Sequence, residues 1–165
     1  MSGPFASMQL SPNVSLSATG GIQLLGASTN GQVGDTTGNV TSWYASLGIT
    51  HRINNYMNQT LSVSKSNPTG LNSNFVGLTS LQHTFSWQLI RDVSLGSAEF
   101  IEYGTDSGGA LAENVWRYGG SVTLGYALTQ KLGLSLTYSL TKRDSNVADR
   151  DYTQNVLTLG ASYAF

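Results

Sequence analysis

The chain has 165 residues and few charges, and both facts limit the folds it can adopt. The length suits one domain. Only 10% of the residues are charged, against roughly 25% in an average soluble domain. No stretch approaches the roughly 20 apolar residues that a membrane-spanning helix needs, and 39% hydrophobic residues argue against a disordered chain. The composition therefore argues against an ordinary soluble α or α/β enzyme and against a helical membrane protein.

Charge and cysteine content exclude further classes. The formal net charge is −1 and there is no basic stripe, so no nucleic-acid partner is expected. The chain has no cysteine, which excludes disulfides and thiolate metal sites. The start, Met1 to Pro4, lacks the basic and apolar regions of a signal peptide. If the protein is exported, we expect the sequence to be a mature form or a fragment.

The dominant pattern is an alternation of apolar and small polar residues, which predicts β-strands. It is clearest in residues 132–140, where leucines and Tyr138 alternate with Gly, Ser and Thr. Residues 1–12 are expected to form a flexible N-terminal segment, and residues 13–165 the folded domain. The expected strands in chain order are about 13–28, 41–53, 57–66, 78–90, 93–103, 115–128, 132–140 and a last one after residue 151.

The fifth of these segments, about 93–103, alternates poorly. Its two carboxylates, Glu99 and Glu102, cannot share a face of one regular strand, because successive side chains point to opposite faces. We therefore predict a β-bulge near Gly96–Ala98.

The connections between the eight segments alternate in length. Short turns fall at Asn54–Asn55, at Arg91–Asp92 and at Thr129–Lys131. Long polar loops fall at about 29–40, 66–77, 104–114 and 142–151. This arrangement is typical of outer-membrane barrels. The sequence predicts an all-β fold: a transmembrane antiparallel up-and-down β-barrel of eight strands, or part of a larger barrel wall, with both termini on the short-turn rim.

Two orientations of such a sheet are open. In a soluble barrel or sandwich the apolar face is buried, whereas in a membrane barrel it meets lipid and the polar face lines the interior. The polar face here is nearly uncharged and rich in glycine, which is unfavourable for a soluble surface. Aromatic residues near both strand ends suit the two interfaces of a bilayer. We therefore favour the membrane barrel, with an aromatic girdle of Trp43, Trp87, Trp116 and Tyr126.

The C-terminal segment resembles the terminal assembly signal of bacterial outer-membrane proteins. The matching positions are Thr158, Gly160, Tyr163 and Phe165. The resemblance implies location in the bacterial outer membrane and delivery to the barrel-assembly machinery by a strand that adds edge to edge.

Residues 118–165 also resemble the closing hairpins of the putative β-barrel porin 2 family. The stretches that carry this resemblance are Leu132–Tyr138, Lys142–Asn146 and Asp151–Asn155. The overall size is similar to that of small barrels of the OmpA and OmpX type. Both resemblances imply a transmembrane β-barrel.

Small inward side chains favour either a narrow water-filled lumen or a wider wall, formed by oligomerisation or within a larger porin. An eight-stranded barrel is only wide enough for its own side chains. The loop between the fifth and sixth segments places Glu102 opposite Arg117. The two could form a constriction pair that filters solutes or a structural cross-strand pair, and we favour the structural interpretation.

Other polar residues give no catalytic or metal site. His51 and His83 fall on the apolar face, with no nucleophile beside them and no carboxylate at a helpful spacing. No enzyme activity, metal or cofactor is expected. The loop about 142–151 carries both signs of charge; it could contact lipopolysaccharide or divalent cations, or form a solvated, self-paired loop.

The leading functional interpretation is passive: a porin-like channel or pore wall for small polar solutes. The alternative is a non-conducting structural or adhesion barrel that acts through its external loops. Expected partners are the lipid bilayer with its lipopolysaccharide, the barrel-assembly machinery and, as one option, further copies of the chain.

Overall fold

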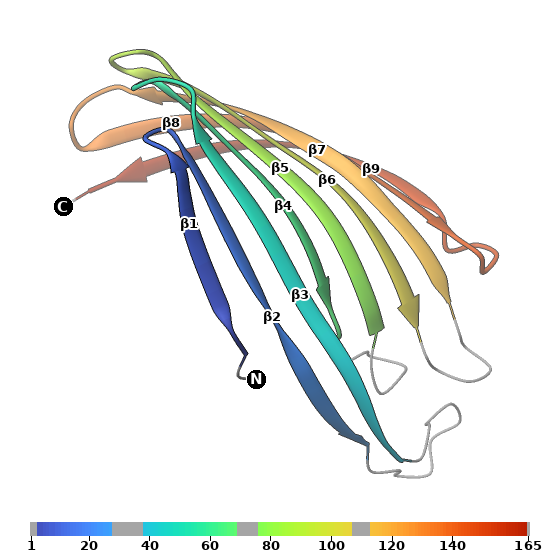
Figure 1. Cartoon of the computed structure of the whole chain (residues 1–165). Helices are drawn as coiled ribbons and strands as arrows, with labels where there is room; N and C mark the ends of the chain where they lie inside the picture. Colours follow the sequence, from blue (N-terminus) through green and yellow to red (C-terminus); the bar gives the residue numbers. More distant parts are fainter. Residues whose placement is uncertain (1–2, 28–37, 69–75, 107–112, 165) are drawn as a thin grey trace.

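The computed structural model describes residues 3–27, 38–68, 76–106 and 113–164. They form one strongly curved antiparallel sheet of nine strands arranged in chain order (Figure 1). The described residues include no helix with the length and apolar character needed to cross a membrane. The strands are β1 (Phe5–Ser11), β2 (Val14–Ala27), β3 (Gly38–Arg52), β4 (Met57–Ser66), β5 (Val76–Ile90), β6 (Val93–Asp106), β7 (Asn114–Ala127), β8 (Leu132–Ser145) and β9 (Tyr152–Tyr163).

The structure has one strand more than the sequence predicts. The additional strand is β1, which lies in the segment 1–12 that was expected to be flexible. It pairs with β2 over most of its length, with Met8 opposite Leu16. The strand has only 7 residues, and its first aromatic residue, Phe5, lies on the same face as Ser7 and Gln9. The apolar alternation is therefore too short and too irregular to identify β1 from sequence.

The sheet is not closed into a barrel, so the prediction of a closed eight-stranded barrel is wrong. β1 and β9 form the two edges and do not pair with each other. Because nine is an odd number, the first and last strands run in the same direction. β1 therefore runs from the middle of the sheet, where Phe5 lies opposite Thr19 of β2, to the short-turn end, and β9 also finishes at the short-turn end (Figure 1). The expectation of both termini on one rim is wrong for the same reason.

The predicted bulge near Gly96–Ala98 is also absent. Pairing of β6 with both neighbours is continuous there, with Ala98 opposite Thr84 and Ser121. Among the described strands, the pairings shift only beside two turns, between Gln9 and Ser11 and between Gln88 and Ile90. The prediction failed because it required both glutamates on the polar face. Glu99 instead lies on the apolar face beside His83, so the strand needs no interruption.

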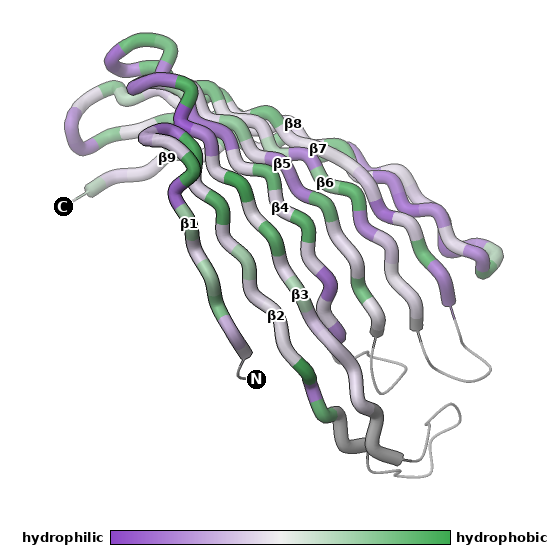
Figure 2. The backbone as a smooth tube through the Cα atoms, viewed as in Figure 1, coloured by the Kyte–Doolittle hydropathy of each residue, from purple (hydrophilic) through white to green (hydrophobic). Residues whose placement is uncertain are grey.

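The sheet has one polar and one apolar face, and Figure 2 shows the corresponding alternation along the strands. One row of side chains across the polar face consists of Thr50, Thr60, Thr84, Ala98, Ser121 and Ser139. A matching row on the apolar face consists of Met57, Trp87, Leu95, Leu124, Leu136 and Leu159.

No hydrophobic side chain among the described residues is buried. Large apolar side chains are instead exposed, Leu159 by 80% and Leu24 by 77%. The buried side chains are polar: Asn67, Ser80 and Glu113. Burial of apolar surface is the main favourable term in folding, and contiguous exposed apolar surface of this size marks contact with a membrane or a partner. This sheet thus lacks the core of a soluble domain.

The polar face is closely packed. Hydroxyl groups meet across neighbouring strands, at 2.8 Å between Ser64 and Ser80 and at 2.8 Å between Thr123 and Thr137. Glycines lie beneath neighbouring hydroxyls: a Cβ added at Gly160 would approach the Ser135 oxygen to 2.6 Å. Side chains converge on the concave side of a curved sheet, so these contacts indicate that the polar face is the concave one.

Candidate functional site

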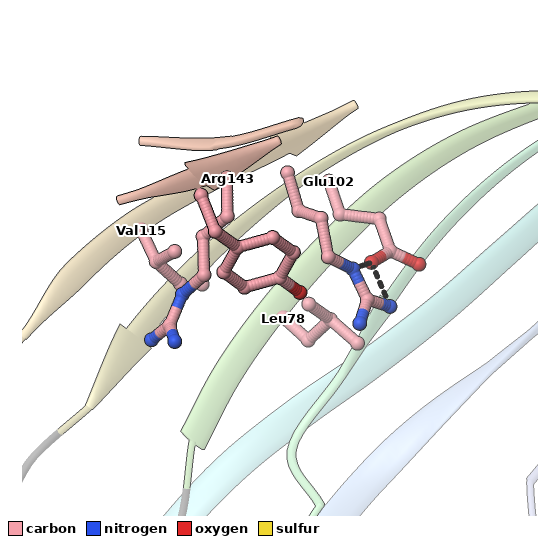
Figure 3. A pocket seen from close by; sticks show the side chains of 7 residues that line it. Leu78, Glu102, Val115 and Arg143 are labelled. Atoms are coloured by element: carbon pink, nitrogen blue, oxygen red, sulfur yellow. Dashed lines mark hydrogen bonds and ion pairs between the residues drawn. The ribbon is translucent and has the colours of Figure 1, made fainter. Parts of the chain in front are cut away.

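A hollow of about 250 Å³ lies on the polar face near the long-loop end. Its charged residues come from successive strands, because Arg117 of β7 pairs with Glu102 of β6 on one side and with Arg143 of β8 on the other. Figure 3 shows the side chains that line the hollow, with Arg143 set apart from Glu102 and its ion-pair partner. The lining residues are Leu78, Glu102, Gly104, Val115, Arg117, Arg143 and Tyr152.

The predicted pairing of Glu102 with Arg117 is present. Arg117 donates from Nε to Glu102 Oε2 at 2.8 Å, and its Nη2 lies 2.6 Å from the same oxygen (Figure 3). The Arg117 guanidinium also lies 5.5 Å from the ring centre of Phe100. The Glu102 side chain is only 12% exposed, whereas that of Arg117 is 48% exposed. The arginine therefore reaches toward solvent from a shielded carboxylate, and its part in filtering solutes stays a prediction.

A second charged cluster beside this hollow was not identified from sequence. Glu113 is buried just before β7 and accepts hydrogen bonds at 2.6 Å from Arg143, Arg150 and Ser145. These residues connect the start of β7 to the end of β8 and to the loop before β9. The partners lie 30 to 37 positions apart in sequence, and no local pattern marks Glu113.

The pKa of Glu113 reflects two opposing effects. Burial raises the pKa of this carboxyl. Hydrogen bonds from Ser145 and Arg150, with the charges of Arg143 and Arg150, outweigh burial and lower the pKa below its ordinary value. Glu113 is therefore an anion at neutral pH and fixes two arginines at the long-loop end.

The predicted loop of about 142–151 is partly strand, because β8 continues to Ser145, and the charges of this segment are only partly self-paired. Lys142 and Asp144 pair within it at 3.1 Å, but Arg143 and Arg150 pair with Glu113, which lies outside it. Within the described ranges, no three His, Cys, Asp or Glu side chains gather in a way that could hold a metal ion. Taken together, the hollow and the neighbouring cluster combine two carboxylates with three guanidinium groups, a small positive excess.

The four girdle residues all lie on the apolar face. Trp43 and Trp116 are near the long-loop end, and Trp87 and Tyr126 are nearer the short turns. The Lys65 ammonium lies 4.1 Å from the ring centre of Trp43. Trp116 packs against Tyr103 with ring centres 4.8 Å apart. Their contact with a membrane interface stays a prediction.

The residues of the proposed assembly signal divide between the two faces. Thr158 and Gly160 lie on the polar face opposite Thr137 and Ser135. Tyr163 lies on the apolar face opposite Leu132. Phe165 lies outside the described residues. All of them belong to or follow the edge strand β9, and their role in assembly stays a prediction.

Both histidines lie on the apolar face, as the sequence predicts, but their surroundings differ from expectation. His83 Nδ1 lies 2.7 Å from Glu99 Oε2, so a carboxylate does sit beside it. Gln59 bridges the two rings, at 3.3 Å from His51 and at 3.5 Å from His83. The cluster was not predicted from the sequence, because a register shift between Gln88 and Ile90 brings Glu99 opposite His83.

One family description matches the chain: Putative beta-barrel porin 2 matches residues 50–165, more than two thirds of the chain. The chain therefore belongs to this family, which confirms the resemblance seen in its closing hairpins. The matched region contains β4 to β9 and every residue of the charged hollow. No curated protein and no solved structure matches the chain significantly.

Proposed function

We propose that this chain forms a porin-like pore wall in the bacterial outer membrane, through which small polar solutes pass without chemical change. The observation that carries the proposal is the absence of any buried hydrophobic side chain in the described part of the chain, together with the gathering of large apolar side chains on one face. Such a sheet gains its hydrophobic stabilisation only when that face meets an apolar medium. Membership of a porin family supports acyl chains as that medium.

Strand length supports the same conclusion. β3 and β5 have 15 residues each, and β6, β7 and β8 have 14 each. A tilted strand needs about 9–11 residues to cross the hydrocarbon layer, while strands of soluble domains are most often about 5–6 residues long. These strands cross a bilayer with residues to spare at both rims.

The polar face would line the lumen. Its rows of Ser, Thr and Gly consist of small side chains and carry few charges. Water can hydrogen-bond to these hydroxyls, so a hydrated path along them costs little. Small inward side chains therefore suit a wide, weakly selective pore better than a small barrel filled by its own side chains.

Closure needs strands beyond the nine described. Within hydrocarbon, open sheet edges do not occur, because each unpaired backbone group costs several kcal/mol. β1 and β9 run in the same direction, so pairing these two edges of one chain would give a parallel pair. Pairing β9 of one chain with β1 of an identical chain that has the same orientation in the membrane would also give a parallel pair. Antiparallel closure requires an odd number of further strands between these two edges. We therefore propose that the sheet is one part of a larger barrel wall.

The charged hollow is the proposed constriction. Glu102, Arg117 and Arg143 stand side by side on the lumen face near one rim. Charged rings at a narrow point set ion preference. The positive excess of the hollow and its neighbouring cluster predicts a weak preference for anions.

Reconstitution into planar bilayers tests the proposal. Refolded together with the further strands that close the wall, the protein should show a shift in gel mobility between boiled and unboiled samples and should produce stepwise, weakly selective conductance. Liposomes that contain the protein should swell in small sugars and not in large dextrans. Folded, inserted protein without conductance would refute the pore and favour the non-conducting barrel with functional loops. Protein that folds in water without any amphiphile would refute the membrane location itself.

A further inference from the structure

A depression of about 590 Å³ lies on the apolar face of the sheet, where β3 pairs with β4. The side chains of this face that line it are Trp43, Ala45, Leu47, Val63 and Lys65. Ala45 stands between two large apolar side chains of β3, and the position opposite it on β2 is Gly20. Two small residues side by side therefore leave a hollow among larger ones.

Lys65 brings a positive charge to this depression without a compensating carboxylate. Its ammonium lies 4.1 Å from the ring centre of Trp43. Among the described residues, no ion pair includes Lys65. A charged side chain on a lipid-facing surface normally meets a partner or the membrane interface, so this ammonium is available to an anion from outside the sheet.

A buried hydrogen bond fixes the end of β4 beside Trp43. Asn67 is only 5% exposed, and its Nδ2 donates to the backbone carbonyl oxygen of Trp43 at 2.9 Å. This bond continues the attachment of β4 to β3 beyond Ser66, the last residue of the strand. The backbone that carries Lys65 is therefore held against β3, and the depression is a defined feature of the face.

The depth of Lys65 suits a lipid headgroup. Met57 begins β4 opposite Trp87, the girdle residue near the short turns, and Lys65 follows eight positions later. At about 3.3 Å per residue and a tilt of about 40°, these positions differ in depth by roughly 20 Å. The apolar band of an outer-membrane barrel is about 25 Å tall. Lys65 therefore lies close to the interface at the long-loop end, within reach of headgroups for its long side chain.

We propose that this depression binds an anionic membrane lipid of the outer leaflet, with the lipid phosphate on Lys65 and an acyl chain along Leu47 and Val63. The long loops of outer-membrane barrels are extracellular, so this rim meets the outer leaflet. A lysine ammonium is a common phosphate ligand, and an indole ring suits the boundary between headgroups and acyl chains. Ile49 and Leu61 continue the apolar surface toward the short turns.

The basic residues of the segment 142–151 are less suited to this role. Lys142 also lies on the apolar face near this rim, 5.6 Å from the ring centre of Tyr118, but its ammonium pairs with Asp144 at 3.1 Å. Arg143 and Arg150 pair with Glu113. Their charges are compensated within the protein, whereas that of Lys65 is not. Lys142 is therefore a matched control for Lys65.

The inference rests on the proposed membrane location, and quenching of a single tryptophan tests it. Trp87→Phe with Trp116→Phe leaves Trp43 as the only one of the three tryptophans. This parent variant is refolded, as for the conductance measurements, into phosphatidylcholine vesicles that contain brominated phosphatidylglycerol or brominated phosphatidylcholine. Bromine near the top of the acyl chains quenches a tryptophan that the lipid touches. We expect the anionic lipid to bind beside Trp43 about fivefold more strongly than the zwitterionic one.

Three substitutions in the parent variant test the residues. Lys65→Gln should remove the preference for the anionic lipid, whereas Lys142→Gln, which changes the net charge equally, should leave it intact. Ala45→Leu fills the depression without removing a charge and should weaken the preference. Because both lipids are compared within one variant, a change in the intrinsic fluorescence of Trp43 does not affect the ratio.

The outcomes separate this site from the membrane location. Equal quenching of Trp43 by the two lipids overturns the lipid site and leaves the pore wall standing. A preference that survives Lys65→Gln, or that both glutamine variants lose equally, also overturns it. If an excess of inorganic phosphate at constant ionic strength abolishes the preference, a free anion and not a lipid occupies the site. Absence of quenching by either lipid overturns the membrane location and the lipid site together.

Discussion

A charged side chain placed on the apolar face of β7 should lower the free energy of unfolding far more than the same side chain placed on the polar face. Val122 lies on the apolar face, where it is 50% exposed. Ser121, its neighbour in sequence, lies on the polar face between Ala98 and Ser139. Arginine at each of these positions tests which face meets lipid, with the strand and the depth nearly unchanged.

The magnitude follows from the position in the strand. β7 runs from Asn114 to Ala127, so Val122 lies within two residues of its midpoint. At about 3.3 Å per residue and a tilt of about 40°, it is roughly 4 Å from mid-depth. Arginine on the lipid face at this depth costs about 2–4 kcal/mol. Ser121→Arg should cost about 1 kcal/mol or less, because its guanidinium reaches lumen water past two small neighbours.

A third variant separates lipid from a dry protein core. Val122→Phe adds apolar surface and should gain up to about 1 kcal/mol in lipid, where nothing confines the ring. In a packed core the larger side chain would cost about 1–3 kcal/mol through overpacking. The sign of the change distinguishes the two environments.

The assay is urea titration of protein refolded into phospholipid vesicles, followed by the fluorescence of the three tryptophans. The expected order of stability is Val122→Phe, wild type, Ser121→Arg and then Val122→Arg. Equal stability of the two arginine variants would refute the reasoning, and so would a loss of stability in the phenylalanine variant.

Three further perturbations have defined outcomes. Glu102→Gln should raise the anion-to-cation permeability ratio by about twofold, read from the reversal potential in a salt gradient, because it leaves Arg117 unbalanced; an unchanged ratio would place the constriction elsewhere. Glu113→Gln should cost about 1–2 kcal/mol at neutral pH. Since the folded pKa of Glu113 is lowered from its ordinary value of about 4.5, this stabilisation is present above that value and lost as the pH falls through the lowered pKa. A difference between wild type and variant that persists in strong acid contradicts this assignment. Gly119→Ala should cost about 1–3 kcal/mol, because the added Cβ meets the Leu140 carbonyl oxygen. Gly96→Ala is the control: its Cβ would lie 3.8 Å from the nearest atom, so it should change stability by under about 1 kcal/mol. Equal losses of stability for the two alanine variants in unfolding titrations would contradict the role given to the contact between the Gly119 position and the Leu140 backbone.

The sequence alone predicted those features of the fold that depend on residues close together in the chain. Which face a side chain occupies follows from its parity in a strand, so the apolar positions of β8 and both histidines were predicted correctly. The position of the long loop between β6 and β7 then predicted the pairing of Glu102 with Arg117. The same reasoning at the Arg91–Asp92 turn would pair His83 with Phe100. A register shift between Gln88 and Ile90 brings Glu99 opposite His83 instead, so this contact was not readable from the sequence.

Properties that depend on distant residues were not accessible. β1 is short and is defined by its pairing with β2 more than by its own alternation. Whether a sheet closes depends on the match between its two edges, which no local pattern reports. The cluster around Glu113 joins residues about 30 positions apart through a loop connection. These features follow from the register of the whole sheet.

The orientation of the sheet is the central claim, and site-directed spin labelling tests it most directly. Nitroxides placed singly at Leu134, Ser135, Leu136 and Thr137 of β8 in liposomes report collisions with oxygen, which concentrates in lipid, and with a water-soluble nickel chelate. The account predicts that the two leucine positions favour oxygen and that the Ser and Thr positions favour nickel. The reverse assignment, or four positions shielded from both reagents, would contradict it.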